Sequence, residues 1–144
     1  MARVQKSVLV THTPERMSAL VEDVPAYPRF LPWCGGAAIR EQNGAVTVAS
    51  VTIDFHGVRQ SFTTCNTRVG PDRIDIALVD GPFRRLEGHW NFQALGTDGC
   101  KVELVLEYEF ASHLLERLIG PVFSRIANSL VDAFVARADS LDGG

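Results

Sequence analysis

The chain has 144 residues, of which 46% are hydrophobic and 22% charged, and its formal net charge is −3. These values are typical of a folded globular protein and exclude a disordered chain, a collagen-like repeat and a disulfide scaffold. No apolar run approaches the roughly 18 residues of a membrane span, and the first residues lack the hydrophobic stretch of a signal peptide. We therefore expect one cytoplasmic domain over residues 1–144, in which residues 140–144 form a loose tail.

The basic residues are twelve Arg and two Lys, against 17 Asp and Glu. An acidic chain lacks the positive field that binding to DNA usually requires, so no DNA partner is expected. Arginine is nevertheless the side chain best suited to phosphate contacts. The candidates for polar or phosphate contacts are Arg29, Arg84 and Arg85.

Neither a metal site nor a catalytic site is predicted. The cysteines Cys34, Cys65 and Cys100 include no C-x-x-C pair, and core positions are the simpler interpretation. The four histidines are scattered, without an acid or a second histidine at the spacing of zinc or iron sites. An enzymatic triad needs a nucleophile, a base and an orienting group that meet in space, and no such set is evident.

The N-terminal part predicts a strand and then a helix. Residues 3–11 alternate imperfectly between apolar and polar side chains, as in a strand. Thr13 is placed to cap a helix with Pro14 at its first position. The apolar residues that follow recur at helical spacing: Met17, Leu20, Val21 and Val24.

A proline-rich segment follows over residues 24–36. Its three prolines at positions 25, 28 and 32 predict short turns and no regular element. Large apolar side chains on irregular backbone indicate a mobile lid or a contact surface. These side chains are Tyr27, Phe30, Leu31 and Trp33.

The middle of the chain predicts strands. Six runs are separated by short turn signals, which favour antiparallel hairpins: residues 39–42, 46–55, 58–69, 73–80, 86–95 and 101–110. Apolar side chains alternate with polar ones along the last two runs, so that Trp90 faces inward and His89 faces the opposite side. The sheet is therefore expected to have one wet face and one covered face.

The C-terminal part predicts a long amphipathic helix over residues 114–137, capped by Ser112. Pro121 predicts a kink or a break in it. Its apolar stripe is Leu115, Leu118, Ile119, Val122, Ile126, Leu130 and Ala133, widened by Phe123 and Phe134. These elements predict an α+β fold in which a curved antiparallel sheet of about seven strands grips the helix. A twisted sheet does not press flat against one helix, so a cavity between them is expected.

Four segments carry a family resemblance: residues 24–34 (VPAYPRFLPWC), 80–86 (DGPFRRL), 88–92 (GHWNF) and 134–138 (FVARA). Together they resemble the coenzyme-Q-binding START-domain family, which includes the bacterial RatA proteins. That family lies within the helix-grip superfamily of polyketide cyclases and birch-pollen allergens. The resemblance extends over nearly the whole chain and implies a helix-grip fold with a hydrophobic cavity.

The resemblance implies a non-enzymatic protein that binds ubiquinone or a related isoprenoid lipid and supports respiration. It requires no cofactor beyond that ligand, and contact with the inner-membrane surface stays open. The alternative is a RatA-type toxin that binds the large ribosomal subunit and blocks subunit association, and a third reading is a cyclase- or dehydratase-like enzyme. The wall expected for the ligand is Tyr27, Phe30, Trp33, Phe83, Leu86, Trp90, Phe92, Val122, Phe123 and Ile126. Tyr27, Arg84 and Arg85 are expected to supply donors at its mouth.

Overall fold

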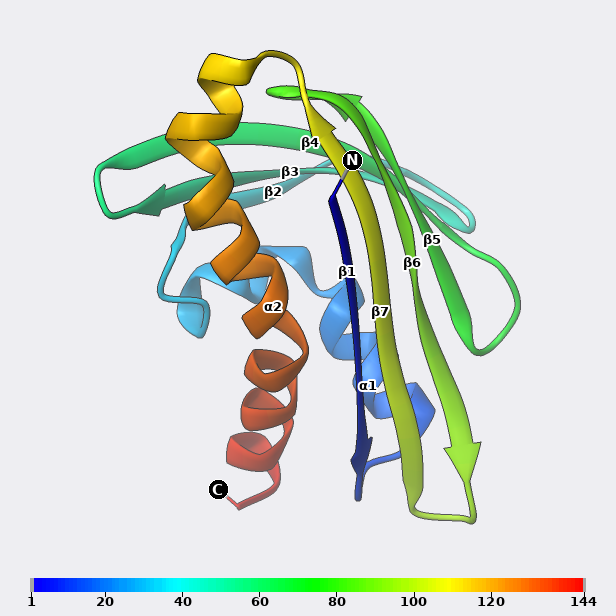
Figure 1. Cartoon of the computed structure of the whole chain (residues 1–144). Coiled ribbons are helices and arrows are strands. Elements are labelled where there is room, and N and C mark those ends of the chain that lie inside the picture. The colour runs from blue at the N-terminus through cyan, green and yellow to red at the C-terminus, as the bar shows by residue number, and fades with distance from the viewer. Residues whose placement is uncertain (1, 144) are drawn as a thin grey trace.

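The structure, a computed structural model, describes residues 2–143. Seven strands form one sheet, and a short helix, a 3₁₀ helix and a long helix lie on its inner side (Figure 1). In chain order the elements are β1 (Ala2–Val10), α1 (Pro14–Glu22), η1 (Val24–Arg29), β2 (Cys34–Asn43), β3 (Val46–Phe55), β4 (Val58–Arg68), β5 (Arg73–Asp80), β6 (Phe83–Leu95), β7 (Gly99–Phe110) and α2 (His113–Gly143). The helix-grip fold predicted from the sequence is confirmed.

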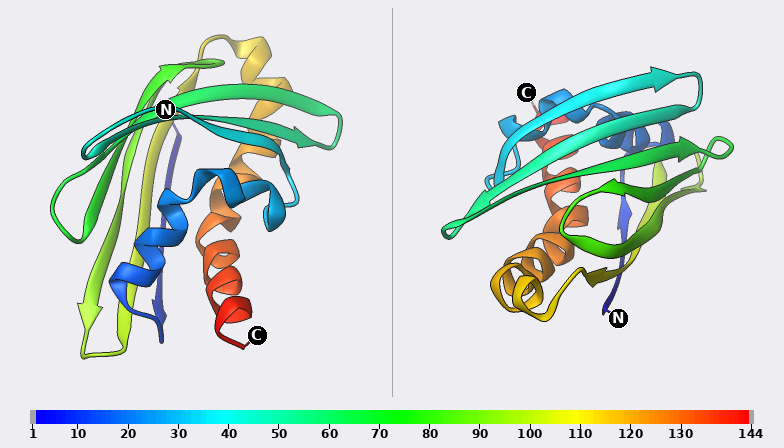
Figure 2. Two further views of the ribbon diagram at one scale, coloured as in Figure 1. Left: turned by 180° about the vertical axis from the view of Figure 1, so that it is seen from behind. Right: turned by 90° about the horizontal axis from the view of Figure 1, so that it is seen from above.

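The sheet is antiparallel throughout, with the strand order β1-β7-β6-β5-β4-β3-β2. All six predicted strands of the middle region are present and pair as hairpins, while β1 joins the far end by pairing with β7, Val4 opposite Leu106. Register shifts interrupt the β2–β3, β4–β5 and β6–β7 ladders. Because bulges increase the local bend of a strand, they help the sheet to curve around α2, as Figure 2 shows.

The N-terminal helix begins as predicted. Thr13 has extended backbone and its side chain accepts a hydrogen bond from the Arg16 amide at 3.2 Å, with Pro14 in the first turn. The prediction of short turns for the proline-rich segment is wrong for residues 24–29, which form the 3₁₀ helix η1. Proline is tolerated there because it fixes φ near the helical value. Two of the large apolar side chains of the segment are buried, Leu31 at 1% and Trp33 at 7% exposed, while Tyr27 and Phe30 are partly buried against the core.

The long helix α2 is continuous from His113 to Gly143, so Pro121 does not break it. Ser112 caps it as predicted, accepting from the Leu115 amide at 3.2 Å. The expected loose tail is wrong for residues 140–143, which are helical, and Gly144 lies outside the described residues. Leu118, assigned to the apolar stripe, is 60% exposed. The stripe that is buried instead consists of Ile119, Phe123, Ile126, Ala127, Val131, Phe134 and Ala138.

By length and composition α2 could cross a membrane. Its buried stripe packs into the core beside β1, β7 and α1, and the core helix of a folded domain can have the same length and composition. The core is closed by aromatic rings that meet edge to face. Phe134 contacts Tyr27, Phe30 and Trp90 in this way, with ring centroids 5.3–5.5 Å apart.

Gly88 allows β6 and β7 to approach closely. A Cβ atom at this position would lie 2.0 Å from the carbonyl oxygen of Val105, a backbone atom that cannot swing away. We therefore expect Gly88→Ala to lower the free energy of unfolding by about 1–3 kcal/mol, the usual cost of overpacking. Urea denaturation measures the change. The matched control is Gly36→Ala in β2, where a Cβ meets nothing within 4 Å, and it should leave stability unchanged or slightly higher.

Candidate functional site

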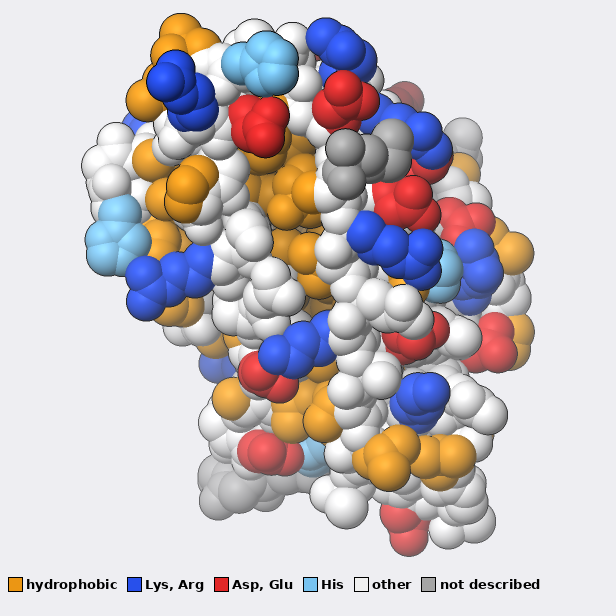
Figure 3. Space-filling model, viewed as in Figure 1, with side chains coloured by type: hydrophobic (Ala, Val, Ile, Leu, Met, Phe, Trp, Pro, Cys, Tyr) orange, Lys and Arg blue, Asp and Glu red, His pale blue; other side chains and the backbone are white. Residues whose placement is uncertain are grey.

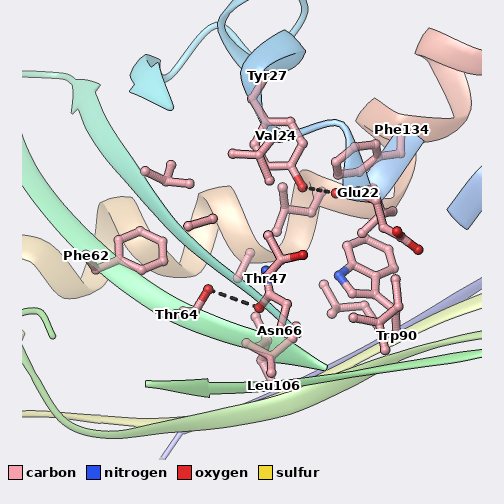
Figure 4. Close-up of a pocket in the computed structure, with 18 of the residues that line it drawn as sticks. Glu22, Val24, Tyr27, Thr47, Phe62, Thr64, Asn66, Trp90, Leu106 and Phe134 are labelled. Carbon is pink, nitrogen blue, oxygen red and sulfur yellow. Dashed lines mark hydrogen bonds between the residues drawn. The ribbon is translucent and has the colours of Figure 1, made fainter. Parts of the chain in front are cut away.

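A cavity of about 130 Å³ lies between α2 and the concave face of the sheet. Its wall comes from the end of α1, from η1, from the middle of α2 and from strands β3 to β7 (Figure 4). It is a space that the side chains of the sheet and the helix leave unfilled, beside the contact between Phe62 of β4 and Phe123 of α2. The cavity predicted between sheet and helix is therefore present.

Most of the wall is apolar and aromatic. Six of the ten side chains expected to form it do so: Tyr27, Trp33, Leu86, Trp90, Phe123 and Ile126. Other strands and helix turns complete it with residues that include Phe62, Ile74, Leu104, Leu106, Leu130 and Phe134. Such a wall suits a flat or branched apolar group, which gains contact area on every side.

The other four expected wall residues do not line the cavity: Phe30, Phe83, Phe92 and Val122. Phe92 is 0% exposed and belongs to the solid core. Phe83 stacks on Phe110 at 5.0 Å and meets Phe123 edge to face at 4.9 Å, so neighbouring rings separate it from the cavity. Phe30 packs on Phe134 from the far side and lies under the Arg137 guanidinium at 5.2 Å. A Phe83→Ala change would therefore test core packing and not ligand uptake.

Polar side chains form one strip of the wall, on β3 and β4. Thr47 and Asn66 are directly opposite one another in the β3–β4 ladder. The Thr64 hydroxyl donates to the Asn66 side-chain oxygen at 3.1 Å, drawn as a dashed line in Figure 4. At the rim the Arg68 guanidinium forms an ion pair with the Glu22 carboxylate, joining β4 to the end of α1. The strip thus places neutral groups inside the cavity and a neutralised charge pair at its edge.

The predicted donors at the mouth are elsewhere. The Tyr27 hydroxyl faces the end of α1 and donates to the Val21 carbonyl oxygen, which ties η1 to α1. Arg84 donates to Glu109 at 3.4 Å, and Arg85 is paired with Glu87, which raises the pKa of its guanidinium. Both arginines are exposed and outside the cavity wall, and so is Arg29.

The sequence of β4 contains a signal for the polar strip. Phe62, Thr64, Asn66 and Arg68 alternate along β4, so the period-two rule places all four on one face. Because three of these four side chains are polar, the alternation is typical of a solvent-exposed strand face, although in the structure this face lines the cavity.

The cysteines and histidines stay outside the cavity wall. Cys34 and Cys100 are buried as predicted, and burial raises the pKa of both thiols, whereas Cys65 is only half-buried. His89 lies on the side of β6 opposite Trp90, as predicted, but is half-buried. His12, for which the sequence indicates no acidic partner, is 5% exposed, and its Nε2 lies 2.7 Å from Asp139 near the end of α2. Within residues 2–143 there is no group of three or more acidic, histidine or cysteine side chains placed to hold a metal ion.

A curved sheet closed on one helix, with an apolar cavity between them, defines a small-molecule-binding fold of the helix-grip class. Residues 10–135 match the model of the polyketide cyclase / dehydrase and lipid transport family, and the chain belongs to this family. It is 43% identical to the ribosome association toxin RatA of Vibrio cholerae over 143 residues, 99% of each chain. It is 29% identical to the mitochondrial coenzyme Q-binding protein coq10 of Schizosaccharomyces pombe, over 92% of this chain and 84% of that protein. The crystal structure of the Zhui aromatase/cyclase from Streptomyces sp. R1128 has the same fold, with a TM-score of 0.84 at 15% identity over 96% of this chain and 93% of that one.

Burial raises the pKa of Tyr27 above its usual value. The folded protein therefore keeps this phenol protonated at a pH where the unfolded chain has lost the proton, so stability is lost as pH rises above about 10. We expect the free energy of unfolding to fall by up to about 1.4 kcal/mol per pH unit for this one proton. Urea denaturation of the wild type and of Tyr27→Phe between pH 8 and pH 11.5 measures it.

At pH 8 Tyr27→Phe should cost about 1 kcal/mol, because the hydrogen bond to Val21 is lost. Above pH 10 its stability should fall less steeply than that of the wild type. Burial also raises the pKa of Tyr108, so this residue contributes its own loss of stability at high pH. The variant Tyr108→Phe measures that contribution separately. Identical slopes in wild type and Tyr27→Phe would contradict the prediction.

Proposed function

We propose that the protein binds an apolar small molecule in the cavity without converting it, and that the ligand is a quinone or a related isoprenoid lipid. The observation that carries the proposal is the cavity wall itself, which is mostly apolar, includes six aromatic side chains and carries a short neutral polar strip. An isoprenoid quinone has a flat ring, carbonyl oxygens and an apolar tail, and the wall offers a counterpart to each. The name of the fission-yeast relative, a coenzyme Q-binding protein, supports this ligand class.

The size of the cavity suits part of such a ligand. A volume of about 130 Å³ is below the roughly 300–1,000 Å³ of sites that enclose a drug-sized molecule. We infer that a ring-sized group or a short stretch of chain is enclosed, and that the rest of the ligand leaves through the mouth between α1 and β4. The Arg68–Glu22 pair stands at that mouth.

Binding without chemistry agrees with the side chains present. Among the described residues that line the cavity there is no histidine or cysteine, and Glu22 is paired with Arg68 at the rim. The threonine hydroxyls of the wall therefore have no histidine beside them to act as general base. The cyclase-like neighbour shares the fold at an identity too low to carry its chemistry over. We propose a cytoplasmic location, as for a protein similar to the bacterial RatA proteins.

The two tryptophans provide the first test, because Trp33 and Trp90 are the only ones in the chain and both line the cavity. A short-chain benzoquinone should quench their fluorescence saturably and at one molecule per chain. Ala127→Leu adds bulk to the cavity from α2 and should weaken the affinity at least about tenfold.

The matched control is Ala136→Leu, which adds the same bulk on the exposed side of α2 and should bind as the wild type does. Circular dichroism establishes that both variants are folded. If the quinone does not quench the wild type, or quenches Ala127→Leu with unchanged affinity, the cavity is not the binding site.

A second function is favoured by the similarity of 43% over 99% of the chain to a ribosome association toxin. We propose association with the large ribosomal subunit as this alternative. The electrostatic support is modest, because basic and acidic side chains are interspersed on the face seen in Figure 3. The exposed arginines Arg84 and Arg85 are paired with Glu109 and Glu87, so a phosphate would have to displace these carboxylates.

Sedimentation with purified large subunits through a sucrose gradient tests the ribosomal alternative. Arg84→Gln with Arg85→Gln should release the protein, since two exposed cations that face phosphates are removed. Arg59→Gln, which removes an exposed arginine in β4, is the control and should sediment with the subunit. Co-sedimentation that is unchanged by the double substitution would remove both arginines from the contact.

A further inference from the structure

The indole N–H of Trp90 is an unused hydrogen-bond donor inside the cavity. Trp90 is 5% exposed, and Figure 4 shows its nitrogen directed into the cavity, on the side where Asn66 and Thr47 lie. Within the described part of the chain no residue accepts a hydrogen bond from it. A ligand atom that accepts a hydrogen bond from this N–H would be stabilised at this position in the cavity.

Asn66 supplies a second donor of the same kind. Its side-chain oxygen is already used, since it accepts from the Thr64 hydroxyl at 3.1 Å. Its amide nitrogen makes no hydrogen bond to another residue between positions 2 and 143. An amide nitrogen and an indole nitrogen can only donate, so both sites call for an acceptor on the ligand.

The charge at the mouth is not available to a ligand. The Arg68 guanidinium is engaged by the Glu22 carboxylate and also donates to the carbonyl oxygens of Gly70 and Pro71. An anion in the cavity would therefore lose its hydration shell and meet only neutral donors, which is unfavourable. A neutral acceptor such as a ketone or quinone oxygen is desolvated at much lower cost.

We propose that Trp90 and Asn66 determine ligand specificity by donating hydrogen bonds to an uncharged carbonyl oxygen on a ring-sized group, so that the cavity discriminates against carboxylates. This inference rests on the proposed function, because it requires that an apolar molecule enters the cavity. It narrows the ligand class to neutral carbonyl compounds with an apolar chain. Fatty acids in their ionised form fall outside it.

Isothermal titration calorimetry with three probes tests the proposal: a decyl-substituted 1,4-benzoquinone, decylbenzene and 4-decylbenzoate. The wild type should bind the quinone about tenfold or more tightly than the hydrocarbon, and bind the benzoate most weakly. Trp90→Phe keeps an aromatic ring but removes the N–H, so affinity for the quinone should fall about tenfold while affinity for decylbenzene is unchanged. Asn66→Leu should act in the same direction.

Asn91→Leu makes the same change outside the cavity wall, on the opposite side of β6 from Trp90, and should leave the preference for the quinone intact. If Trp90→Phe and Asn66→Leu weaken both neutral probes equally, or neither, the two donors do not select the ligand, although the proposed binding function stands. The proposal is also overturned if the benzoate binds the wild type as tightly as the quinone. If none of the three probes binds the wild type, the proposed function fails together with this inference.

Discussion

The structure depends on one geometric constraint: a strongly curved sheet has to bury its concave face against a single helix. Near the start of α2 the sheet and the helix pack together through Phe83, Phe110 and Phe123, whose ring centroids lie 4.9–6.0 Å apart. Farther along, Phe62 of β4 still meets Phe123 of α2 edge to face, with ring centroids 6.1 Å apart, but the neighbouring side chains of β3 and β4 leave a space against the helix. The cavity is this space, and its wall is the part of the core that no opposing side chain fills.

The order of polarity from rim to interior gives the cavity its chemical character. Charges are confined to the rim, where Arg68 and Glu22 neutralise one another with partial access to water. Inside, the polar groups are neutral and few, and the rest of the wall is apolar. A wall built in this way offers a ligand mainly apolar contact area, with a small number of hydrogen-bonding groups that could fix its orientation.

The fold could be predicted closely from the sequence, because its signals are local. Turn residues and period-two alternation give the six hairpin strands, and Thr13, Pro14 and Ser112 mark where helices begin. The site was predicted less well, since whether a buried ring lines a cavity or fills the core depends on what lies opposite it. Phe83 and Phe123 are adjacent in space, yet only Phe123 reaches the cavity. Tyr27 was expected to donate to a ligand, but the end of α1 brings the Val21 carbonyl oxygen within its reach, a contact that sequence spacing does not indicate.

The side of the cavity away from β1 is closed by side chains alone. Main-chain hydrogen bonds join each strand of the sheet to its neighbours, but within residues 2–143 none joins α2 to β2, β3 or β4. The Arg68–Glu22 pair is a polar link between α1 and β4, and partly exposed pairs of this kind contribute about 1 kcal/mol or less. Opening the cavity on this side therefore requires only that apolar contacts between α2 and these strands separate, and every strand pairing can stay intact.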